Sequence, residues 1–220
     1  YTGTFKNSKP YGIGKIIFVD GGSYEGEWID GNFDGKGIII YSNGDTYSGY
    51  FENGKRAGFG ELNSRNNHQY SGEWKNDEKN GSGIITYLDG SVYEGQLKDG
   101  LQQGSGTLTR EDGLKIKGSW VKGELKGFVE IQQPNGDRYE GEMFDGKRNG
   151  EGKTIYASGD TYNGNFKNDK RDGTGVYVSK LGHSYEGQWE NGKMSGKGKT
   201  IFSDGSIYIG DFVNDNAHGL

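Results

Sequence analysis

Three histidines are the residues of this chain best suited to bind a metal ion or to transfer protons. His68 and His183 occupy the twenty-second position of a 23-residue period, and His218 occupies the eleventh. On a β-sheet that follows this period, five repeats place the first two on the order of 48 Å apart along one edge, with His218 on the other edge. We therefore predict solvated turn histidines, no metal site and no cofactor.

Carboxylates are numerous, but their arrangement is uniform. Glu25, Glu27 and Glu73 exemplify acidic residues at the second and fourth positions of the period, where strand alternation turns them toward solvent. A catalytic pair needs two carboxyl groups in different environments, and a solvated row does not provide that. A Gly-x-Gly at positions 12 and 14 lacks the helix N-terminus that a phosphate loop needs. We predict that the chain is not an enzyme.

Composition narrows the class of protein further. Of 220 residues 43 are glycine, 2 are proline and none is cysteine, and 13% are aromatic. Scarce proline together with abundant aromatic residues favours a glycine-punctuated β protein over a disordered chain. The net charge of −5 comes from interspersed acidic and basic residues, so we expect no nucleic-acid partner. The absence of cysteine favours a reducing, cytoplasmic location.

A 23-residue repeat organises the whole chain, 1–220. Ten repeats begin at residues 1, 24, 47, 70, 93, 116, 139, 162, 185 and 208, and the last is partial. Positions 3 and 12 are glycine in every copy. Position 14 is glycine except at Val129, and position 21 is glycine except at Asn67. Position 5 is aromatic except at Leu97 and Met143.

Each repeat reads as a β-hairpin. Positions 1, 3 and 5 alternate with polar residues, which predicts a strand with one apolar face, and positions 14 to 18 predict the second strand. Glycine and asparagine between these strands predict a turn, and pairs such as Asn43-Gly44 connect one hairpin to the next. The fold class is therefore all-β: an elongated, twisted, single-layer antiparallel sheet of consecutive hairpins, roughly 90 Å long at the usual strand spacing.

The unit Y-x-G-x-[WF]-x-x-G-x-x-x-G-x-G-x-x-x-[YF]-x-x-G resembles the MORN (membrane occupation and recognition nexus) repeat along the entire chain. Members of that family lay partner helices or extended peptides in a groove, or dimerise through terminal repeats. Their long arrays occur in cytoskeletal, ciliary or membrane-skeleton settings. The resemblance therefore implies a protein partner or a homodimer, and a cytoplasmic location associated with the cytoskeleton or a cilium.

The aromatic face is the predicted partner surface, because a single-layer sheet has no second layer over its rings. The alternative is that most of these rings form a minimal core. The candidate partner-binding residues are Tyr24, Trp28, Tyr47, Phe51, Tyr70, Trp74, Tyr93, Trp120, Tyr185 and Trp189.

Three basic pairs at turn positions 9 and 10 are candidate contacts for acidic lipids or phosphoinositides. They are Lys55-Arg56, Lys147-Arg148 and Lys170-Arg171. Stable membrane attachment usually needs a cluster of about 4–8 basic residues, and nearby aspartates dilute these pairs. Lipid binding is therefore the alternative to protein binding, and a third hypothesis makes the array the regulatory portion of a larger enzyme.

The stretch 97–134 departs from the pattern. It lacks the position-5 ring at Leu97, the first-position tyrosine at Ile116 and the glycine at Val129. Three interpretations are open: a bend in the array, a tailored binding site, or neutral drift tolerated within a repeat protein.

Overall fold

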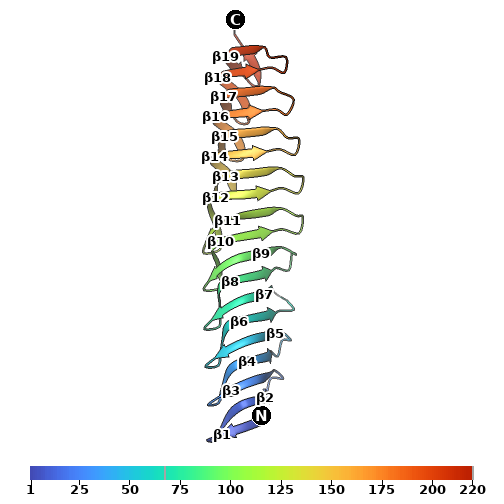
Figure 1. The fold of residues 1–220 in the computed structure, drawn as a ribbon, viewed down its shortest axis with the longest axis vertical. Coiled ribbons are helices and arrows are strands. Elements are labelled where there is room, and N and C mark those ends of the chain that lie inside the picture. The colour runs from blue at the N-terminus through green and yellow to red at the C-terminus, as the bar shows by residue number, and fades with distance from the viewer. Residues whose placement is uncertain (67, 220) are drawn as a thin grey trace. The chain divides into compact units, whose positions relative to one another are not determined.

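The computed structural model describes residues 1–66 and 68–219, so Asn67, the exception at position 21, lies outside it. The described residues form twenty strands and no helix, and consecutive strands pair as antiparallel hairpins (Figure 1). The predicted all-β fold of consecutive hairpins is confirmed. The chain forms two compact units, one of Tyr1–Glu111 and Trp120–Glu124, the other of Asp112–Ser119 and Leu125–Leu220. The boundary between them falls inside the atypical stretch 97–134.

In the first unit each repeat contributes one shorter and one longer strand. The strands are β1 (Thr2–Lys6), β2 (Lys9–Ile17), β3 (Ser23–Ile29), β4 (Asn32–Ile40), β5 (Thr46–Glu52), β6 (Lys55–Asn63), β7 (Gln69–Lys75), β8 (Glu78–Thr86), β9 (Val92–Lys98) and β10 (Leu101–Thr109). β11 (Lys115–Val121) contributes residues to both units.

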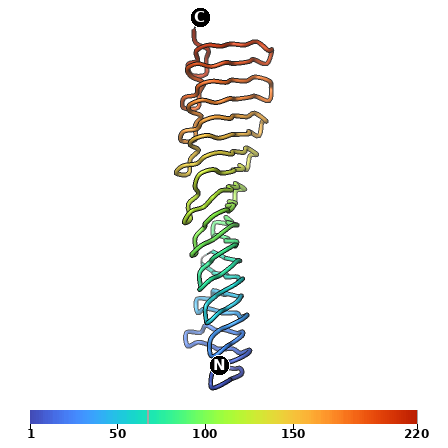
Figure 2. The backbone as a smooth tube through the Cα atoms, turned by 60° about the vertical axis from the view of Figure 1, so that its left-hand side comes forward, coloured from blue at the N-terminus to red at the C-terminus, as the bar shows by residue number. Residues whose placement is uncertain are grey.

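The second unit repeats the same alternation of lengths, and Figure 2 traces its hairpins as successive loops of the backbone. Its strands are β12 (Glu124–Gln132), β13 (Arg138–Phe144), β14 (Lys147–Ile155), β15 (Thr161–Lys167), β16 (Lys170–Val178), β17 (Ser184–Glu190), β18 (Lys193–Ile201), β19 (Ile207–Val213) and β20 (Asn216–His218).

The turn within each hairpin is shorter than the sequence suggested. Between β3 and β4 it consists of Asp30 and Gly31, whose φ angles of 49° and 88° are both positive. Two positive φ values in a two-residue loop suit a type I′ turn, whose twist matches that of the flanking strands. The second strand therefore begins at position 9, and the prediction that placed it at positions 14 to 18 was wrong about where it starts. The Asn43-Gly44 pair lies, as predicted, in the connection between one hairpin and the next, where the backbone N–H of Tyr41 bonds to the oxygen of Asp45.

A β-bulge in each longer strand accounts for the glycine at position 12. In the second repeat Gly26 pairs with Gly37, and Trp28 pairs with Phe33, so two steps on β3 match four steps on β4. Gly35 lies inside this bulge with a φ of 92°, which a residue with a Cβ adopts only at a cost. The bulge re-aims the first residues of the longer strand, so that Phe33 stacks on the ring of Tyr24 with 3.8 Å between centroids.

The core of each unit is a line of aromatic rings on one face of its sheet. In the first unit it contains the fully buried tyrosines at 24, 47, 70 and 93. In the second unit it combines rings with aliphatic side chains: Val129, Ile131, Tyr139, Tyr162, Phe166, Tyr185, Trp189 and Phe212.

Candidate binding surfaces

The ten candidate partner-binding rings lie inside the protein. Trp120, the most exposed of them, has 7% of its surface accessible, and four of the five tyrosines have none. Of the open interpretations, a minimal core therefore describes these rings, and little ring surface is left for a partner. Their role in binding stays a prediction. The ten are Tyr24, Trp28, Tyr47, Phe51, Tyr70, Trp74, Tyr93, Trp120, Tyr185 and Trp189.

Glycine pairs make room for each first-position tyrosine. A Cβ added to Gly37 would lie 2.4 Å from the ring of Tyr24, and one added to Gly26 would lie 2.6 Å from its hydroxyl. The ring thus rests on bare backbone, and its hydroxyl donates a hydrogen bond of 2.8 Å to the backbone oxygen of Glu27. Burial raises the pKa of Tyr24 well above its usual value, with a further contribution from the charge of Glu27.

The rings contact one another edge to face along each unit. Tyr24 meets Trp28 of its own repeat at 5.3 Å and Phe51 of the next repeat at 5.2 Å. Tyr162 repeats the pattern in the second unit, with Phe166 at 5.1 Å and Trp189 at 5.3 Å. Such T-shaped pairs are favoured by the ring quadrupole. The aromatic line therefore joins successive repeats, which no single hairpin could stabilise alone.

In each of the three basic pairs the arginine packs against the aromatic core and the lysine lies in solvent. The guanidinium of Arg56 lies 4.1 Å from the ring centre of Trp74, and its Nε donates to Asp77 over 3.1 Å. Arg148 covers Phe166 at 5.0 Å and likewise bonds to Asp169. Arg171 lies over Trp189 at 4.5 Å. The arginines thus cover the aromatic line, as cation–π contacts favour.

The lysine of each pair remains at the surface. Lys55, Lys147 and Lys170 are all exposed. Lipid binding through the turn rim stays a prediction, and it rests on these three lysines more than on the arginines beside them.

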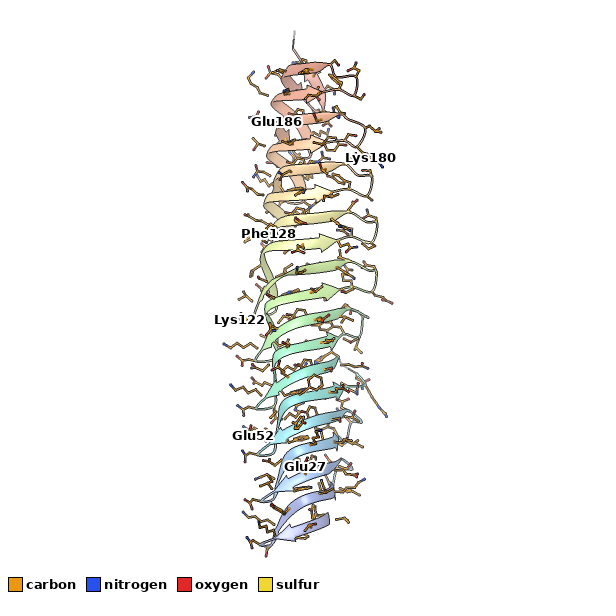
Figure 3. All side chains as sticks on the ribbon, in the orientation of Figure 1. Glu27, Glu52, Lys122, Phe128, Lys180 and Glu186 are labelled. Carbon is orange, nitrogen blue, oxygen red and sulfur yellow. The ribbon has the colours of Figure 1, made fainter. Side chains whose placement is uncertain are left out.

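The opposite face of each sheet, here called the outer face, carries positions 2, 4, 13 and 15 of every repeat. Successive side chains on a strand point to opposite sides, so these positions point away from the tyrosine rings. Glu27 lies on this face of the first unit and Glu186 on that of the second, whereas Glu52 and Lys180 lie at sheet edges (Figure 3).

A recess of about 600 Å³ lies on the outer face of the first unit. Its apolar lining is Ile13, Ile38, Tyr50 and Phe59, which are 69%, 51%, 43% and 55% exposed. Exposed apolar side chains gathered on one face indicate a contact surface. Sequence reasoning missed these residues because the resemblance drew attention to the recurrent rings, while positions 13 and 15 vary from repeat to repeat.

The charge around this recess is mixed, because Lys36 lines it with its amine 5.4 Å from the ring centre of Tyr50, and Glu25 and Glu61 lie beside it. Glu25 forms an ion pair with Lys15 over 3.0 Å. Glu61 instead faces Ser48 and Ser71 on the neighbouring strands. In the described part of the chain no cation forms an ion pair with Glu61.

The corresponding recess of the second unit is polar. It measures about 530 Å³, and its side chains include Asn163, Asn165, Gln188 and Glu186, with Val176 as an apolar member. Asn165 already accepts a bond from the hydroxyl of Thr174. The two units therefore present the same backbone with different surface chemistry.

Two of the three histidines do not occupy the solvated positions that the sequence predicted for them, whereas His218 is exposed as predicted. His68 is partly buried and its Nε2 contacts the amine of Lys79. His183 is partly buried too, and its Nε2 lies 3.0 Å from the hydroxyl of Thr200, which itself donates to the oxygen of Ser184. That prediction was wrong for these two because connections between repeats pack on the longer strands. Among the described residues no three potential ligands gather around one point.

The sequence profile of the MORN repeat matches nine segments of the chain. They are 1–23, 24–46, 47–69, 70–92, 93–115, 139–161, 162–180, 185–207 and 208–220. These segments fill nearly all of the sequence and begin at nine of the ten repeat starts. The chain belongs to the MORN repeat family.

The one unmatched MORN slot, 116–138, still forms a hairpin of β11 and β12. Its two departures from the pattern compensate each other. In other repeats a tyrosine at position 1 rests on a glycine at position 14. Here the shorter Ile116 replaces the tyrosine, and Val129 replaces the glycine and fills the vacated space with 1% of its surface exposed. A Cβ on Gly118 would meet Leu125 and Val129, in the place where other repeats have a tyrosine ring. This slot is thus a repacked MORN repeat.

Solved structures similar to this MORN array are distant. The TCP domain of SAS-4 from Drosophila melanogaster, in complex with a proline-rich motif of Ana2, shares 14% identity, with 90% of this chain and 88% of that chain covered and a TM-score of 0.40. The TCP10 domain of CPAP from Danio rerio shares 14% identity over 90% and 93%, with a TM-score of 0.35. At this similarity neither their partners nor their assemblies extend to this chain. No curated protein sequence matches the chain. No helix that could cross a membrane occurs in residues 1–66 and 68–219.

Proposed function

We propose that this MORN array is a non-catalytic scaffold that binds a protein partner on the outer face of its first unit. The observation that carries the proposal is the recess lined by Ile13, Ile38, Tyr50 and Phe59. These side chains are exposed, whereas the rings at positions 1 and 5 of the second and third repeats are buried, so the exposed side chains contribute little to the core. Family membership supports the proposal, because a sheet built of repeats provides a surface much longer than a single hairpin.

The partner that suits this recess best is an amphipathic helix lying across the strands. Neighbouring strands are about 4.8 Å apart, close to the 5.4 Å pitch of a helix, so one helical turn would face each strand. The distance from Ile13 on β2 to Phe59 on β6 is four strand spacings, or about 19 Å. A helix of roughly 13 residues spans that distance. Apolar residues at i, i+3, i+4 and i+7 would enter the recess, and a lysine or arginine would face Glu61.

The test uses a display library of helical peptides selected on the wild-type protein. Selected peptides are then measured by fluorescence anisotropy against Phe59→Asp and against Phe128→Asp. Phe59 and Phe128 both occupy position 13 and are 55% and 60% exposed, one in each unit. We expect Phe59→Asp to weaken binding at least about tenfold, as loss of a central apolar contact usually does, and Phe128→Asp to leave it unchanged. Equal binding to both variants would remove the outer face of the first unit as the site.

The setting of such a scaffold is part of the same proposal: a cytoplasmic assembly associated with the cytoskeleton or a cilium. Self-association is the competing form of protein binding. Multi-angle light scattering separates the two, because a monomeric mass leaves the recess open to another protein, whereas a dimeric mass that Phe59→Asp converts to monomer makes a second copy the partner.

A further inference from the structure

In several repeats the residue at position 10 covers the tyrosine ring of its own repeat, and in two neighbouring repeats of the first unit the covering group is a cation. Arg56 covers Tyr47, and Asp77, at position 8 of the next repeat, accepts its hydrogen bond. Lys79 covers Tyr70 in the same way, with its amine 5.3 Å from the ring centre. At position 8 of the repeat that follows Lys79, however, the chain has Gly100. Lys79 therefore lacks the carboxylate that Arg56 has.

The neighbours of the Lys79 amine are instead a ring, an imidazole and a second cation. Tyr70 on β7 lies under it, His68 Nε2 contacts it, and Arg56 on β6 is the charged group that acts on it most strongly. Asp77, an acidic residue on the turn before β8, is engaged by Arg56. In the described part of the chain no carboxylate forms an ion pair with Lys79. The side chain is still partly exposed, so a reagent can reach it.

These surroundings favour the neutral amine. Burial, assisted by the charge of Arg56, lowers the pKa of Lys79 to about 8. Burial and the charge of Lys79 in turn lower the pKa of His68, which keeps its imidazole neutral near pH 7. Desolvation and a neighbouring cation are the two general ways in which a lysine becomes a nucleophile at neutral pH. An ordinary lysine, with a pKa near 10.4, has less than about a thousandth of its amine in the free-base form at pH 7.

We propose that Lys79 is a nucleophilic lysine and the preferred site of acylation of this chain by acyl thioesters. In this reaction the free Nζ attacks the thioester carbonyl, a C–N bond forms, and the C–S bond breaks. The thiolate leaves and the nitrogen loses one proton, which His68 Nε2 is placed to accept before it passes to the thiolate or to solvent. The product is a neutral amide over the ring of Tyr70. No oxidant or reductant is needed.

The test treats the folded protein with acetyl-coenzyme A at pH 7 and follows each lysine by peptide mass spectrometry. The exposed lysines Lys147 and Lys170 serve as internal references. We expect Lys79 to be acetylated at least about tenfold faster than either, as an activated amine should be. Between pH 6 and pH 9 the rate at Lys79 should rise and begin to level off above pH 8, while the rates at the references continue to rise.

Two variants give Lys79 the partner it lacks, using residues that the repeat already accepts. His68→Asp places at position 22 the aspartate that Asp45 and Asp160 provide elsewhere, and Gly100→Asp reproduces Asp77. Gly100 has a positive φ of 81° and open space around it, and Asp77 adopts a similar φ of 71°. Each variant should slow acetylation of Lys79 at pH 7 severalfold while leaving Lys147 unchanged. Lys79 reacting no faster than the references, or at the same rate in both variants, would overturn the proposal.

Discussion

The indole nitrogen of Trp74 donates a hydrogen bond of 3.1 Å to the backbone oxygen of Gly60, which belongs to the preceding repeat. The other three tryptophans form the same bond to the residue fourteen positions earlier, at 3.1 to 3.2 Å. A buried indole N–H needs an acceptor, and here the acceptor lies on the neighbouring hairpin. Position 5 therefore does more than fill space, because a tryptophan there also links its repeat to the one before it.

Trp74→Phe should separate this hydrogen bond from ring packing. The phenyl ring still meets Tyr47 edge to face, but the oxygen of Gly60 loses its indole donor. We expect the free energy of unfolding to fall by about 1–2 kcal/mol, the usual effect of deleting a buried hydrogen-bond partner. Urea denaturation followed by tryptophan fluorescence and circular dichroism measures it. Tyr50→Phe, which alters an exposed ring on the outer face, is the control and should change little.

Gly60→Ala tests whether the tyrosine rings require bare backbone. The added Cβ would lie 2.3 Å from the hydroxyl of Tyr47, which is fully buried and cannot move aside. We expect a loss of roughly 2–3 kcal/mol or more, as overpacked cores show. Gly54→Asn is the matched control, because the turn at Gly54 has open space and a positive φ that asparagine tolerates. Similar losses for both variants would mean that turn geometry, not ring contact, requires the glycines.

The effects of substituting Ile116 and Val129 on the free energy of unfolding should be coupled in a double-mutant cycle. Ile116→Tyr alone forces a ring into the space that Val129 fills, and Val129→Gly alone leaves a cavity. Together they restore the tyrosine-on-glycine arrangement of the other repeats. We expect each single change to cost about 1–3 kcal/mol and the double variant to recover at least half of the summed loss. Strictly additive losses in the denaturation midpoints would contradict this compensation.

Arg148→Ala and Lys147→Ala should differ in stability although the two residues are adjacent. The guanidinium of Arg148 covers Phe166 and Tyr139 and bonds to Asp169, whereas Lys147 is exposed. We expect Arg148→Ala to cost about 1–2 kcal/mol through lost packing and cation–π contact, and Lys147→Ala to cost almost nothing. Liposome sedimentation of the Lys147 variant then tests the lipid hypothesis without interference from unfolding. Unchanged sedimentation at low salt would count against that hypothesis.

Alkaline pH should destabilise the protein. Burial raises the pKa of Tyr93, Tyr139 and Tyr162 to about 12, whereas tyrosine in an unfolded chain ionises near 10. Because the folded pKa is the higher one, the contribution of these residues is fully present below pH 10 and is lost as pH rises through 12. We expect the urea midpoint to fall steadily from pH 10 upward, with the tyrosinate absorbance of the buried rings at 295 nm appearing only as the chain unfolds. Full tyrosinate absorbance before unfolding is the contrary result.

The sequence by itself determined the repeat, the hairpin and the positions of the recurrent rings. Three positions recur for reasons that are local to the 23-residue repeat. Glycine at position 3 leaves space beneath a ring, glycine at position 12 adopts a positive φ, and the aromatic residue at position 5 provides a group to bury. Because these requirements are the same in every repeat, the same residue types recur every 23 residues along the chain. The all-β fold of consecutive hairpins therefore followed from the spacing alone.

The two-residue turn and the bulge were not predicted, because both depend on pairing between strands. Asp30-Gly31 carried the signal of a type I′ turn, but only the register of Gly26 with Gly37 shows that the longer strand already begins at Asn32.

Only the tertiary structure decided which face is free to bind and which side chains lie against each other. Arg56 and Lys55 are equivalent as charges in a sequence, but the bulge turns one onto the rings and leaves the other in solvent. Likewise, His68 and Lys79 lie eleven residues apart, and only the antiparallel pairing of β7 with β8 brings the two together. These relationships depend on register and strand twist across neighbouring repeats, for which a local pattern in one repeat carries no signal.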